Sequence, residues 1–413
     1  MNIDHLVCSL CGEHYAPDQV TYTCPKDGGN LSIMFDYKSL AKQVHPSDIL
    51  NAKERSLWRY LPLLPVTDPG GQSTPLHRAG WTPVYQPKRL AEEYGLKQLW
   101  IKDESPNPTA SFKDRASAIV VARAHEIGAK IIVAASTGNA GAAMAGMAAA
   151  LGDKAVIFAP KNAPQAKIAQ LLVFGAKVLL VDGNYDQAFD LSIKASQAFG
   201  WYNRNTGFNP YTAEGKKTGG FEIWEQVITN LPQNSKPLTI FIPVGDGNII
   251  SGIHKGFKDL FALGWIEQMP RLIGVQAEGS AAIAQVFYQG SENILPVAAD
   301  TIADSISVNM PRDGIRALRA ARETDGTYIT VSDSAILKAI ASLGKVGIFA
   351  EPAGATAFAG MVKAIEQGSL LQEDPVLVLN TGSGLKDVNA ALQAVPQAPV
   401  IEPTLDAVKK VLA

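Results

Sequence analysis

Three consecutive segments decide the fold of this chain: DRASAIVVARAHEIG at residues 114–128, KIIVAAS at 130–136 and NAGAAMAGMAAALG at 139–152. The first and third are typical of helices, and the short apolar run between them is typical of a buried strand. The stretch from Ile131 to Gly152 has no charged residue and is long enough to cross a bilayer. Because STGN at 136–139 interrupts it, we predict a buried strand, a loop and a helix instead.

The same alternation continues along most of the chain. It predicts an α/β protein with parallel sheets covered by helices on both faces, arranged as two lobes with a cleft between them. Residues 38–80 are interpreted as a proline-rich linker that packs Trp58 and Tyr60 onto the body. The further strands are predicted at 97–104, 154–160, 176–183, 238–244, 271–278 and 375–382, and the further helices at 88–96, 166–175, 185–199, 218–227 and 250–260.

Charge and cysteine content narrow the class of partner. The 37 basic and 39 acidic residues give a formal charge of -2, which provides no field to attract nucleic acid or an anionic membrane. We therefore expect a small-molecule ligand.

The three cysteines all precede residue 25, a pattern that is typical of a reducing compartment and gives no disulfide framework. Because MNIDHLVCSLCG has no basic head followed by an apolar run, we expect no signal peptide and a cytoplasmic protein.

The N-terminal cysteines predict a small zinc-ribbon-like unit. Cys8 and Cys11 form one knuckle, and Cys24 begins a second in which Asp27 stands at the fourth ligand position. The unit is either a Cys3Asp zinc site, a site completed by His5 or His14, or a ribbon that has lost its metal. We assign no metal ligand from the sequence alone.

Lys113 is the first candidate for chemistry. It lies in NPTASFKDRAS at 107–117, next to Phe112 and just before a helix. A lysine that is shielded from water can lose its proton and hold an aldehyde cofactor as a Schiff base. The alternative is a solvated lysine at a charged helix start.

Two glycine-containing turns follow predicted strands. In the first, Ser136 and Thr137 precede Gly138 and Asn139. The backbone N–H groups of such a turn suit a carboxylate, and the amide of Asn139 can hydrogen-bond an oxygen on a cofactor ring. The second is PVGDGNIISG at 243–252, whose glycines let the backbone approach a phosphate at a helix start. A dinucleotide fingerprint would need a third glycine where Ile250 stands, so a single phosphate fits better. Each turn is alternatively a plain connection between a strand and a helix.

A third loop, NTGSGLKD at 380–387, also follows an apolar strand. A neutral hydroxyl from Thr381 facing a pyridine nitrogen would keep that nitrogen largely unprotonated. Alternatively, Thr381 only satisfies local backbone groups.

Taken in order, these motifs resemble pyridoxal-phosphate enzymes of fold type II and, within them, the threonine synthases. The resemblance covers nearly the whole chain, including the cysteine-rich start, TIADSISVNMPRD at 301–313 and GIFAEPAGATAFAG at 347–360. Ala110 stands where the family commonly has glycine before the serine of SFKDR. The resemblance implies three units: a zinc-ribbon-like unit and linker at 1–45, a large cofactor-binding domain at 46–105 plus 207–413, and a small domain at 106–206.

The resemblance also implies the chemistry. The enzyme would be a carbon-oxygen lyase that acts on phosphates, converting O-phospho-L-homoserine and water to L-threonine and phosphate with pyridoxal 5'-phosphate as cofactor, as a cytoplasmic homodimer. Lys113 would carry the cofactor and shuttle protons, Asn139 would contact the ring hydroxyl and Thr381 the ring nitrogen. Ser136, Thr137 and Lys216 would bind substrate, and the cofactor phosphate would lie on Gly245, Asp246, Gly247, Asn248 and Ile249.

One departure from the family affects the substrate assignment. In NPYTAEGKKT at 209–218, Thr212 stands where relatives often have an arginine that holds the substrate phosphate. Lys216, Lys217 or Arg204 could compensate. The alternatives are a sibling lyase or β-replacement enzyme acting on serine, threonine, phosphoserine or diaminopropionate, a nicotinamide-dependent oxidoreductase, and a zinc-ribbon binding protein with an inactive enzyme body.

Overall fold

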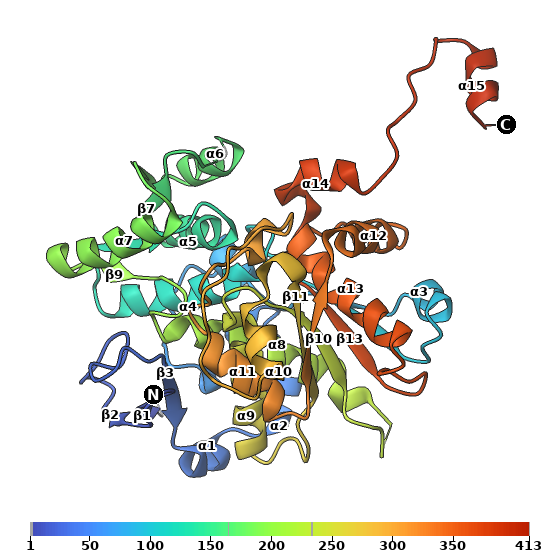
Figure 1. Cartoon of the computed structure of the whole chain (residues 1–413). Helices are drawn as coiled ribbons and strands as arrows, with labels where there is room; N and C mark the ends of the chain where they lie inside the picture. Colours follow the sequence, from blue (N-terminus) through green and yellow to red (C-terminus); the bar gives the residue numbers. More distant parts are fainter. Residues whose placement is uncertain (1–2, 164, 233, 413) are drawn as a thin grey trace.

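The computed structural model describes residues 3–163, 165–232 and 234–412, and its strands form three sheets (Figure 1). The largest has the order β12-β11-β10-β13-β5-β4. Its neighbouring strands are parallel, except for the antiparallel pair at the β4 edge. The strands of this sheet are β4 (Val84–Tyr85), β5 (Leu99–Asp103), β10 (Thr239–Pro243), β11 (Arg271–Ala277), β12 (Thr327–Val331) and β13 (Val376–Asn380).

Alternate side chains of the large sheet enter two different cores. In β13, Leu377 and Leu379 pack into one hydrophobic cluster, whereas Val376 and Val378 pack into the other. Successive side chains of a strand point to opposite faces, so a strand covered on both faces is apolar throughout. This is why the sheet is built from uninterrupted apolar runs and not from alternating ones.

A second, four-stranded sheet has the order β8-β7-β6-β9 and is parallel throughout. A third, three-stranded and antiparallel, has the order β2-β1-β3. In the sequence, the three-stranded sheet precedes β4 and β5, and the four-stranded sheet follows them. This order agrees with the three predicted units, whose boundaries stay a prediction. Their strands are β1 (Ile3–Cys8), β2 (His14–Tyr15), β3 (Leu31–Phe35), β6 (Ile131–Ala135), β7 (Lys154–Pro160), β8 (Lys177–Val181) and β9 (Tyr202–Asn203).

Helices connect most of the parallel strands and cover the sheets (Figure 1). The last helix, α15, lies at the end of an extended segment away from the body. The helices are α1 (Tyr37–Gln43), α2 (Pro46–Leu50), α3 (Lys88–Glu93), α4 (Lys113–Glu126), α5 (Asn139–Leu151), α6 (Gln165–Val173), α7 (Tyr185–Phe199), α8 (Tyr211–Gln226), α9 (Asn248–Ala262), α10 (Ala282–Tyr288), α11 (Gly314–Arg322), α12 (Asp333–Gly344), α13 (Pro352–Glu366), α14 (Val388–Gln393) and α15 (Leu405–Leu412).

The predicted fold class is confirmed, and the local differences have simple causes. The apolar stretch at 131–152 forms β6 and α5, as predicted. Among the described residues, no helix combines the length and apolar character needed to span a membrane. The helix predicted at 218–227 begins earlier, at Tyr211, because Pro210 has helical backbone angles and starts it. β12 was not predicted, since TYITV mixes polar and apolar residues.

The segment at 38–80 is more ordered than a linker. It contains α1, α2 and the 3-10 helices 57–63 and 75–78. Trp58 and Tyr60 are buried, as predicted. The short helices of this segment were not predicted, because they are held by burial of side chains against the body and show no regular period in sequence.

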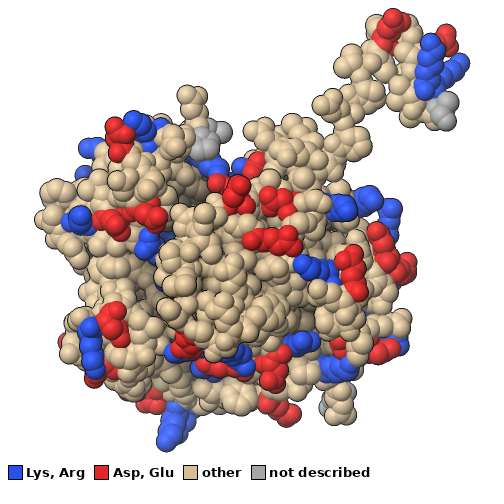
Figure 2. All heavy atoms as spheres, viewed as in Figure 1, with Lys and Arg blue, Asp and Glu red and all other residues tan. Residues whose placement is uncertain are grey.

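Charged side chains of both signs are spread over the face shown in Figure 2, without a broad basic area on that face.

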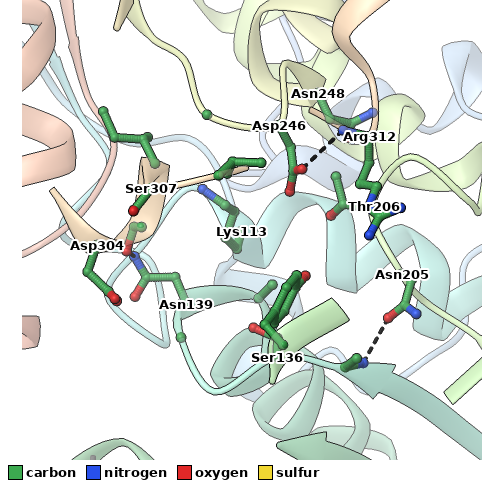
Figure 3. Close-up of a pocket in the computed structure, with 18 of the residues that line it drawn as sticks. Lys113, Ser136, Asn139, Asn205, Thr206, Asp246, Asn248, Asp304, Ser307 and Arg312 are labelled. Atoms are coloured by element: carbon green, nitrogen blue, oxygen red, sulfur yellow. Dashed lines mark hydrogen bonds between the residues drawn. The ribbon is translucent and has the colours of Figure 1, made fainter. Parts of the chain in front are cut away.

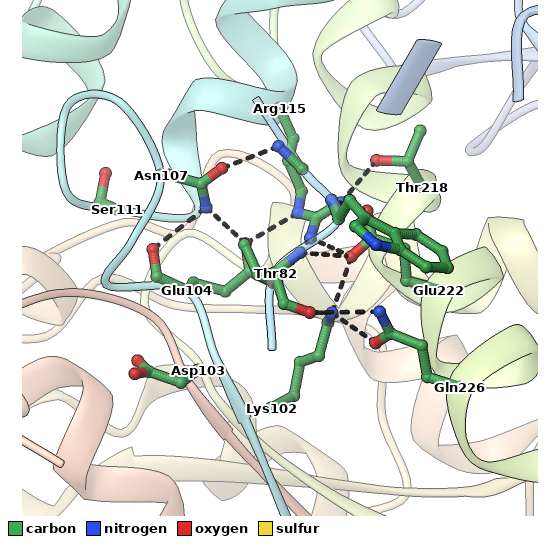
Figure 4. Close-up of polar contacts among 12 residues, drawn as sticks. Thr82, Lys102, Asp103, Glu104, Asn107, Ser111, Arg115, Thr218, Glu222 and Gln226 are labelled. Carbon is green, nitrogen blue, oxygen red and sulfur yellow. Dashed lines mark hydrogen bonds and ion pairs between the residues drawn. The ribbon is translucent and has the colours of Figure 1, made fainter. Parts of the chain in front are cut away.

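The charged side chains with the largest structural consequence are buried inside the protein. Arg115 of α4 is fully buried and donates to two carboxylates, with its Nε 2.8 Å from Glu104 Oε2 and its Nη2 2.8 Å from Glu222 Oε2. Lys102 Nζ lies 2.7 Å from the same Glu222 oxygen (Figure 4).

This buried network joins elements that are distant in sequence. Lys102 belongs to β5, Arg115 to α4 and Glu222 to α8. Burial acts to raise the pKa of Glu222, but Arg115 and Lys102 outweigh it and lower that pKa to about 2. Buried charges are stable only when they are paired and fully hydrogen-bonded. The network therefore fixes how α4, which begins at Lys113, packs on α8.

We predict that Arg115→Met destabilises the protein by about 3–5 kcal/mol, because it leaves Glu104 buried without a cation and removes one of the two cations that pair with Glu222. The midpoint of urea unfolding should fall accordingly. The matched control is Arg89→Met, since Arg89 is exposed on α3. Equal midpoints for the two variants would contradict this account.

Candidate active site

A cavity of about 470 Å³ lies between loops that follow strands of the large and the small sheet. Parallel strands direct their carboxyl ends to one edge, where loops can gather around a ligand. One wall is formed by 134–140 after β6, and the opposite wall by 243–249 after β10. Segments 184–186, 204–206 and 304–310 and single residues that include Lys113, Lys216 and Arg312 also line it.

Lys113 is the first residue of α4, and its side chain projects into this cavity (Figure 3). Its Nζ makes no hydrogen bond or ion pair with any residue that the structure describes. Burial lowers the pKa of Lys113, and the carboxylates of Glu351 and Asp246 only partly oppose this effect. A lowered pKa favours the uncharged amine, which is the state that attacks a carbonyl.

Ala110 in the loop before Lys113 has a φ of 63°. This left-handed region favours glycine, which is the residue commonly found there in the family. An alanine at this position costs roughly 1–2 kcal/mol in backbone strain. The loop therefore keeps its shape with alanine because surrounding contacts hold it, including the bridge between Ser111 and Gly382.

The loop before α5 brings Ser136, Thr137 and Asn139 to the cavity, as predicted. Asn139 Nδ2 donates to Glu351 Oε1 at 2.8 Å, which fixes the orientation of the amide. The helix begins at Gly138 without a side-chain cap, so its first backbone N–H groups are left for a ligand. Gly141 allows this turn, since a Cβ there would lie 2.2 Å from the carbonyl oxygen of Ser136.

The loop before α9 places all five of the predicted residues 245–249 on the cavity. Gly247 has a φ of 91°, and no side chain caps the helix that follows. Asp246 is held beside the cavity by Arg312, whose N donates to Asp246 Oδ1 at 3.2 Å (Figure 3). The uncapped N–H groups of α9 therefore form a site suited to a phosphate.

Lys216 of α8 also lines the cavity and is almost fully buried. Its Nζ donates to Asn248 Oδ1 at 2.6 Å, and Asn248 Nδ2 donates to Asp313 Oδ2 at 2.6 Å. Burial, together with the neighbouring charges of Lys113 and Arg204, holds the pKa of Lys216 well below its usual value. An anion bound between these cations would reverse that effect.

Arg204 adds a further basic side chain to the cavity. From the sequence, it was proposed only as one of three residues that could replace the arginine that relatives often have at position 212. It is buried, and its Nη1 donates to Thr206 Oγ1 at 2.9 Å. Its Nη2 is buried without a hydrogen-bond partner among the described residues. Burial lowers the pKa of Arg204 to about 10. A buried guanidinium with a free donor in a cavity is suited to binding an anion.

Lys217, the third proposed substitute, and Thr212 itself both differ from Arg204. Lys217 forms buried ion pairs with Glu214 and Asp259, and these carboxylates already neutralise its charge. Thr212 donates its hydroxyl to Asn209 O at 2.8 Å and does not line the cavity. Only Arg204 and Lys216 of the proposed substitutes therefore face the cavity.

Thr381 is the one predicted site residue that does not line this cavity. It is buried in the loop after β13, where its carbonyl oxygen accepts from Phe112 N at 2.9 Å. This contact places the loop directly beside Lys113. Glu351, which holds Asn139, was not predicted, although an acidic residue immediately before the helix-starting Pro352 was a usable signal.

A family model described as pyridoxal-phosphate dependent enzyme matches residues 76–382. The chain belongs to this family. It is 36% identical to a threonine synthase of Methanocaldococcus jannaschii over 98% of each chain, and 36% identical to a threonine synthase of Methanosarcina acetivorans over 99% of this chain and 98% of that one. The fold resembles that of a threonine deaminase from Solanum lycopersicum, with a TM-score of 0.66, 22% identity, and coverage of 80% of this chain and 92% of that one.

The cavity of this pyridoxal-phosphate dependent enzyme fits its cofactor. Lys113 would supply an amine for the aldehyde, and the uncapped start of α9 would supply N–H groups for the phosphate. The family membership decides between pyridoxal phosphate and a nicotinamide, which the sequence had left open, in favour of pyridoxal phosphate.

We predict that Lys113→Ala abolishes the visible absorbance of the bound cofactor and lowers kcat by at least roughly a hundredfold, because it removes both the attachment point and the proton carrier. Absorbance spectra and steady-state rates measure the two effects. Lys130→Ala is the control, since Lys130 is exposed on the loop before β6. An unchanged visible band in Lys113→Ala would refute this role.

Proposed function

We propose that this enzyme is a threonine synthase, a carbon-oxygen lyase that converts O-phospho-L-homoserine and water to L-threonine and phosphate. The observation that carries the proposal is the similarity to threonine synthases over 98% of the chain, which leaves no part of the cavity outside the match. A cavity that presents an amine and several cations is consistent with an anionic amino acid as substrate.

The cofactor would be held by four groups of contacts. Lys113 would attach it, and the N–H groups of residues 245–249 would bind its phosphate. Asn139, oriented by Glu351, would hydrogen-bond the ring hydroxyl. Thr381 would have to reach the ring nitrogen from its buried loop beside Phe112. When bound, pyridoxal phosphate supplies an electron sink that stabilises carbanions next to the reacting carbons.

Lys113 would carry the protons of the reaction. A lysine with a lowered pKa can accept the proton from the substrate α carbon near neutral pH and return it later. The same Nζ would move protons at the β carbon during loss of phosphate and addition of water. Its place at the start of α4, with its side chain in the cavity, would let one amine serve both carbons of a bound substrate.

The substrate would be held at its two charged ends. Its carboxylate would bind the uncapped start of α5 together with the hydroxyls of Ser136 and Thr137. Its phosphate would bind Arg204 and Lys216, the two cavity cations that replace the missing arginine.

A second candidate is a sibling β-replacement enzyme or lyase that acts on O-phosphoserine or a hydroxyamino acid. The observation that favours it is Thr212, which does not reach the cavity and cannot hold a phosphate as an arginine would. The chemistry at Lys113 is shared by both candidates, so only the substrate distinguishes them.

We predict that the purified enzyme, supplied with pyridoxal phosphate and O-phospho-L-homoserine, releases phosphate and L-threonine in equal amounts. Phosphate release and amino-acid chromatography measure the two products. O-phospho-L-serine, L-serine and L-threonine serve as competing substrates. Pyruvate or 2-oxobutanoate from these compounds, without phosphate from O-phospho-L-homoserine, would reject threonine synthase in favour of the second candidate.

We predict that Arg204→Met raises the KM for O-phospho-L-homoserine roughly ten- to a hundredfold, since a hydrogen bond to a charged group contributes about 1.5–3 kcal/mol. Inhibition by inorganic phosphate should weaken in parallel. The visible absorbance of the cofactor checks that the variant is folded, and Arg78→Met, at an exposed position, is the matched control. A normal KM and normal phosphate inhibition would exclude Arg204 as the phosphate ligand.

The proposal includes a cytoplasmic homodimer. Three free cysteines are compatible with a reducing compartment. Apolar side chains exposed at Phe349, Leu385 and Leu392 could be covered by a second copy. Light scattering on the purified enzyme would measure the mass, and a value for a single chain would refute the dimer.

A further inference from the structure

The N-terminal unit contains two turns with the same backbone hydrogen bonds. In the first turn, Cys8 N donates to Glu13 O at 2.9 Å, and Gly12 N donates to Cys8 O at 3.1 Å. Gly12 has a φ of 72°. The turn thus reverses the chain so that Cys8 and Cys11 lie on one side.

The second turn repeats this pattern. Cys24 N donates to Gly29 O at 2.9 Å, and Gly28 N donates to Cys24 O at 2.9 Å. Gly28 has a φ of 74°. Asp27 lies between Cys24 and Gly28 as Cys11 lies between Cys8 and Gly12, with the same spacing. Asp27 therefore takes the position in the second turn that Cys11 takes in the first.

The four side chains converge on one point. Their ligand atoms all lie within 4.8 Å of one another. Cys11 Sγ lies 3.8 Å from Cys24 Sγ, and Cys8 Sγ lies 3.3 Å from Asp27 Oδ1. A tetrahedral zinc ion with zinc–sulfur bonds of about 2.3 Å separates its sulfurs by about 3.8 Å. The spacing is therefore that of a zinc site, and it is far from the sulfur–sulfur bond of about 2.05 Å in a disulfide.

We propose that Cys8, Cys11, Cys24 and Asp27 bind one structural zinc ion. Four protein ligands close the coordination shell, which leaves no open position for catalysis. The ligands are also supported from outside: Leu10 N donates to Cys8 Sγ at 3.3 Å, and the hydroxyl of Tyr15 lies 3.0 Å from Cys24 Sγ. Such outer contacts orient ligands in metal sites.

The two histidines are not part of this group. His5 and His14 stack on each other with ring centroids 4.2 Å apart, and neither belongs to the cluster of ligand atoms found among the described residues. The close approach of the two turns instead depends on Gly29, because a Cβ there would lie 2.6 Å from Cys8 Sγ. The fourth ligand is thus Asp27.

The unit is joined to the wall of the active-site cavity. Asn30, which follows the second turn, donates its Nδ2 to the carbonyl oxygens of Gly207 and Arg312, the latter at 3.1 Å. Arg312 lines the cavity. Tyr22 stacks on Phe208 with ring centroids 4.5 Å apart.

A second contact fixes the segment that carries Arg204. The hydroxyl of Tyr22 accepts from Asn203 N at 2.9 Å, one residue before Arg204. Zinc binding would hold the two turns together and thereby keep Tyr22 and Asn30 against this wall. The inferred role of the zinc is therefore to position the cavity cations indirectly, through the N-terminal unit.

Metal content of the full-length chain tests the site directly. Protein produced in zinc-supplemented medium and purified without chelator should contain about one zinc per chain by mass spectrometry. Cys11→Ala and Asp27→Ala should lose the metal, whereas Asp27→Cys should retain it as a four-cysteine site. Glu13→Ala is the matched control, since this exposed carboxylate lies in the first turn outside the cluster. A zinc content near zero in the unaltered chain, or full retention in Asp27→Ala, would overturn the proposal.

The positioning role has a separate test, which rests on the proposed threonine synthase activity. In Cys11→Ala, the thermal unfolding midpoint should fall, and the KM for O-phospho-L-homoserine should rise at least roughly threefold while the visible absorbance of the cofactor persists. An unchanged KM with lost zinc would overturn the positioning role and leave the zinc site standing. If the unaltered enzyme does not use this substrate, the metal analysis still decides the site.

Discussion

The buried ion pairs of Arg115 with Glu104 and Glu222 are the constraint on which the rest of the structure depends. The pair with Glu222 joins α4 to α8, and all three side chains are fully buried, where an unpaired charge is costly. Because Lys113 and Arg115 lie on the same first turn of α4, the geometry that satisfies the guanidinium also sets where the lysine emerges. α8 carries Lys216, so one polar network places both Lys113 and Lys216.

The chemistry is placed where strands end and helices begin without side-chain caps. α5 and α9 both start at glycine and leave backbone N–H groups facing the cavity. These groups, together with Lys113, Arg204 and Lys216, make the cavity strongly suited to anions. Burial lowers the pKa values of Lys113, Arg204 and Lys216. Repulsion by neighbouring basic groups adds to this effect for the two lysines, and bound phosphate and carboxylate groups would relieve that repulsion.

The N-terminal unit is connected to this electrostatic arrangement through backbone contacts. Asn30 and Tyr22 reach the segments that carry Arg312 and Arg204. A small antiparallel sheet of three short strands has little core of its own, so a metal would supply the rigidity that such contacts need. The unit would therefore support the cavity without contributing a residue to its lining.

The sequence by itself determined the local features: the α/β alternation, the position of Lys113 at a helix start, and the glycine turns at 136–141 and 243–252. These depend on short-range periodicity and on backbone preferences, which neighbouring residues fix. Only the tertiary structure decided which distant residues meet. It showed that Arg204 has a free donor in the cavity and that Lys217 is already paired. It also showed that Glu351 holds Asn139 and that Thr381 does not line the cavity. No local pattern encodes such contacts, because they depend on how separate elements pack around the buried charges.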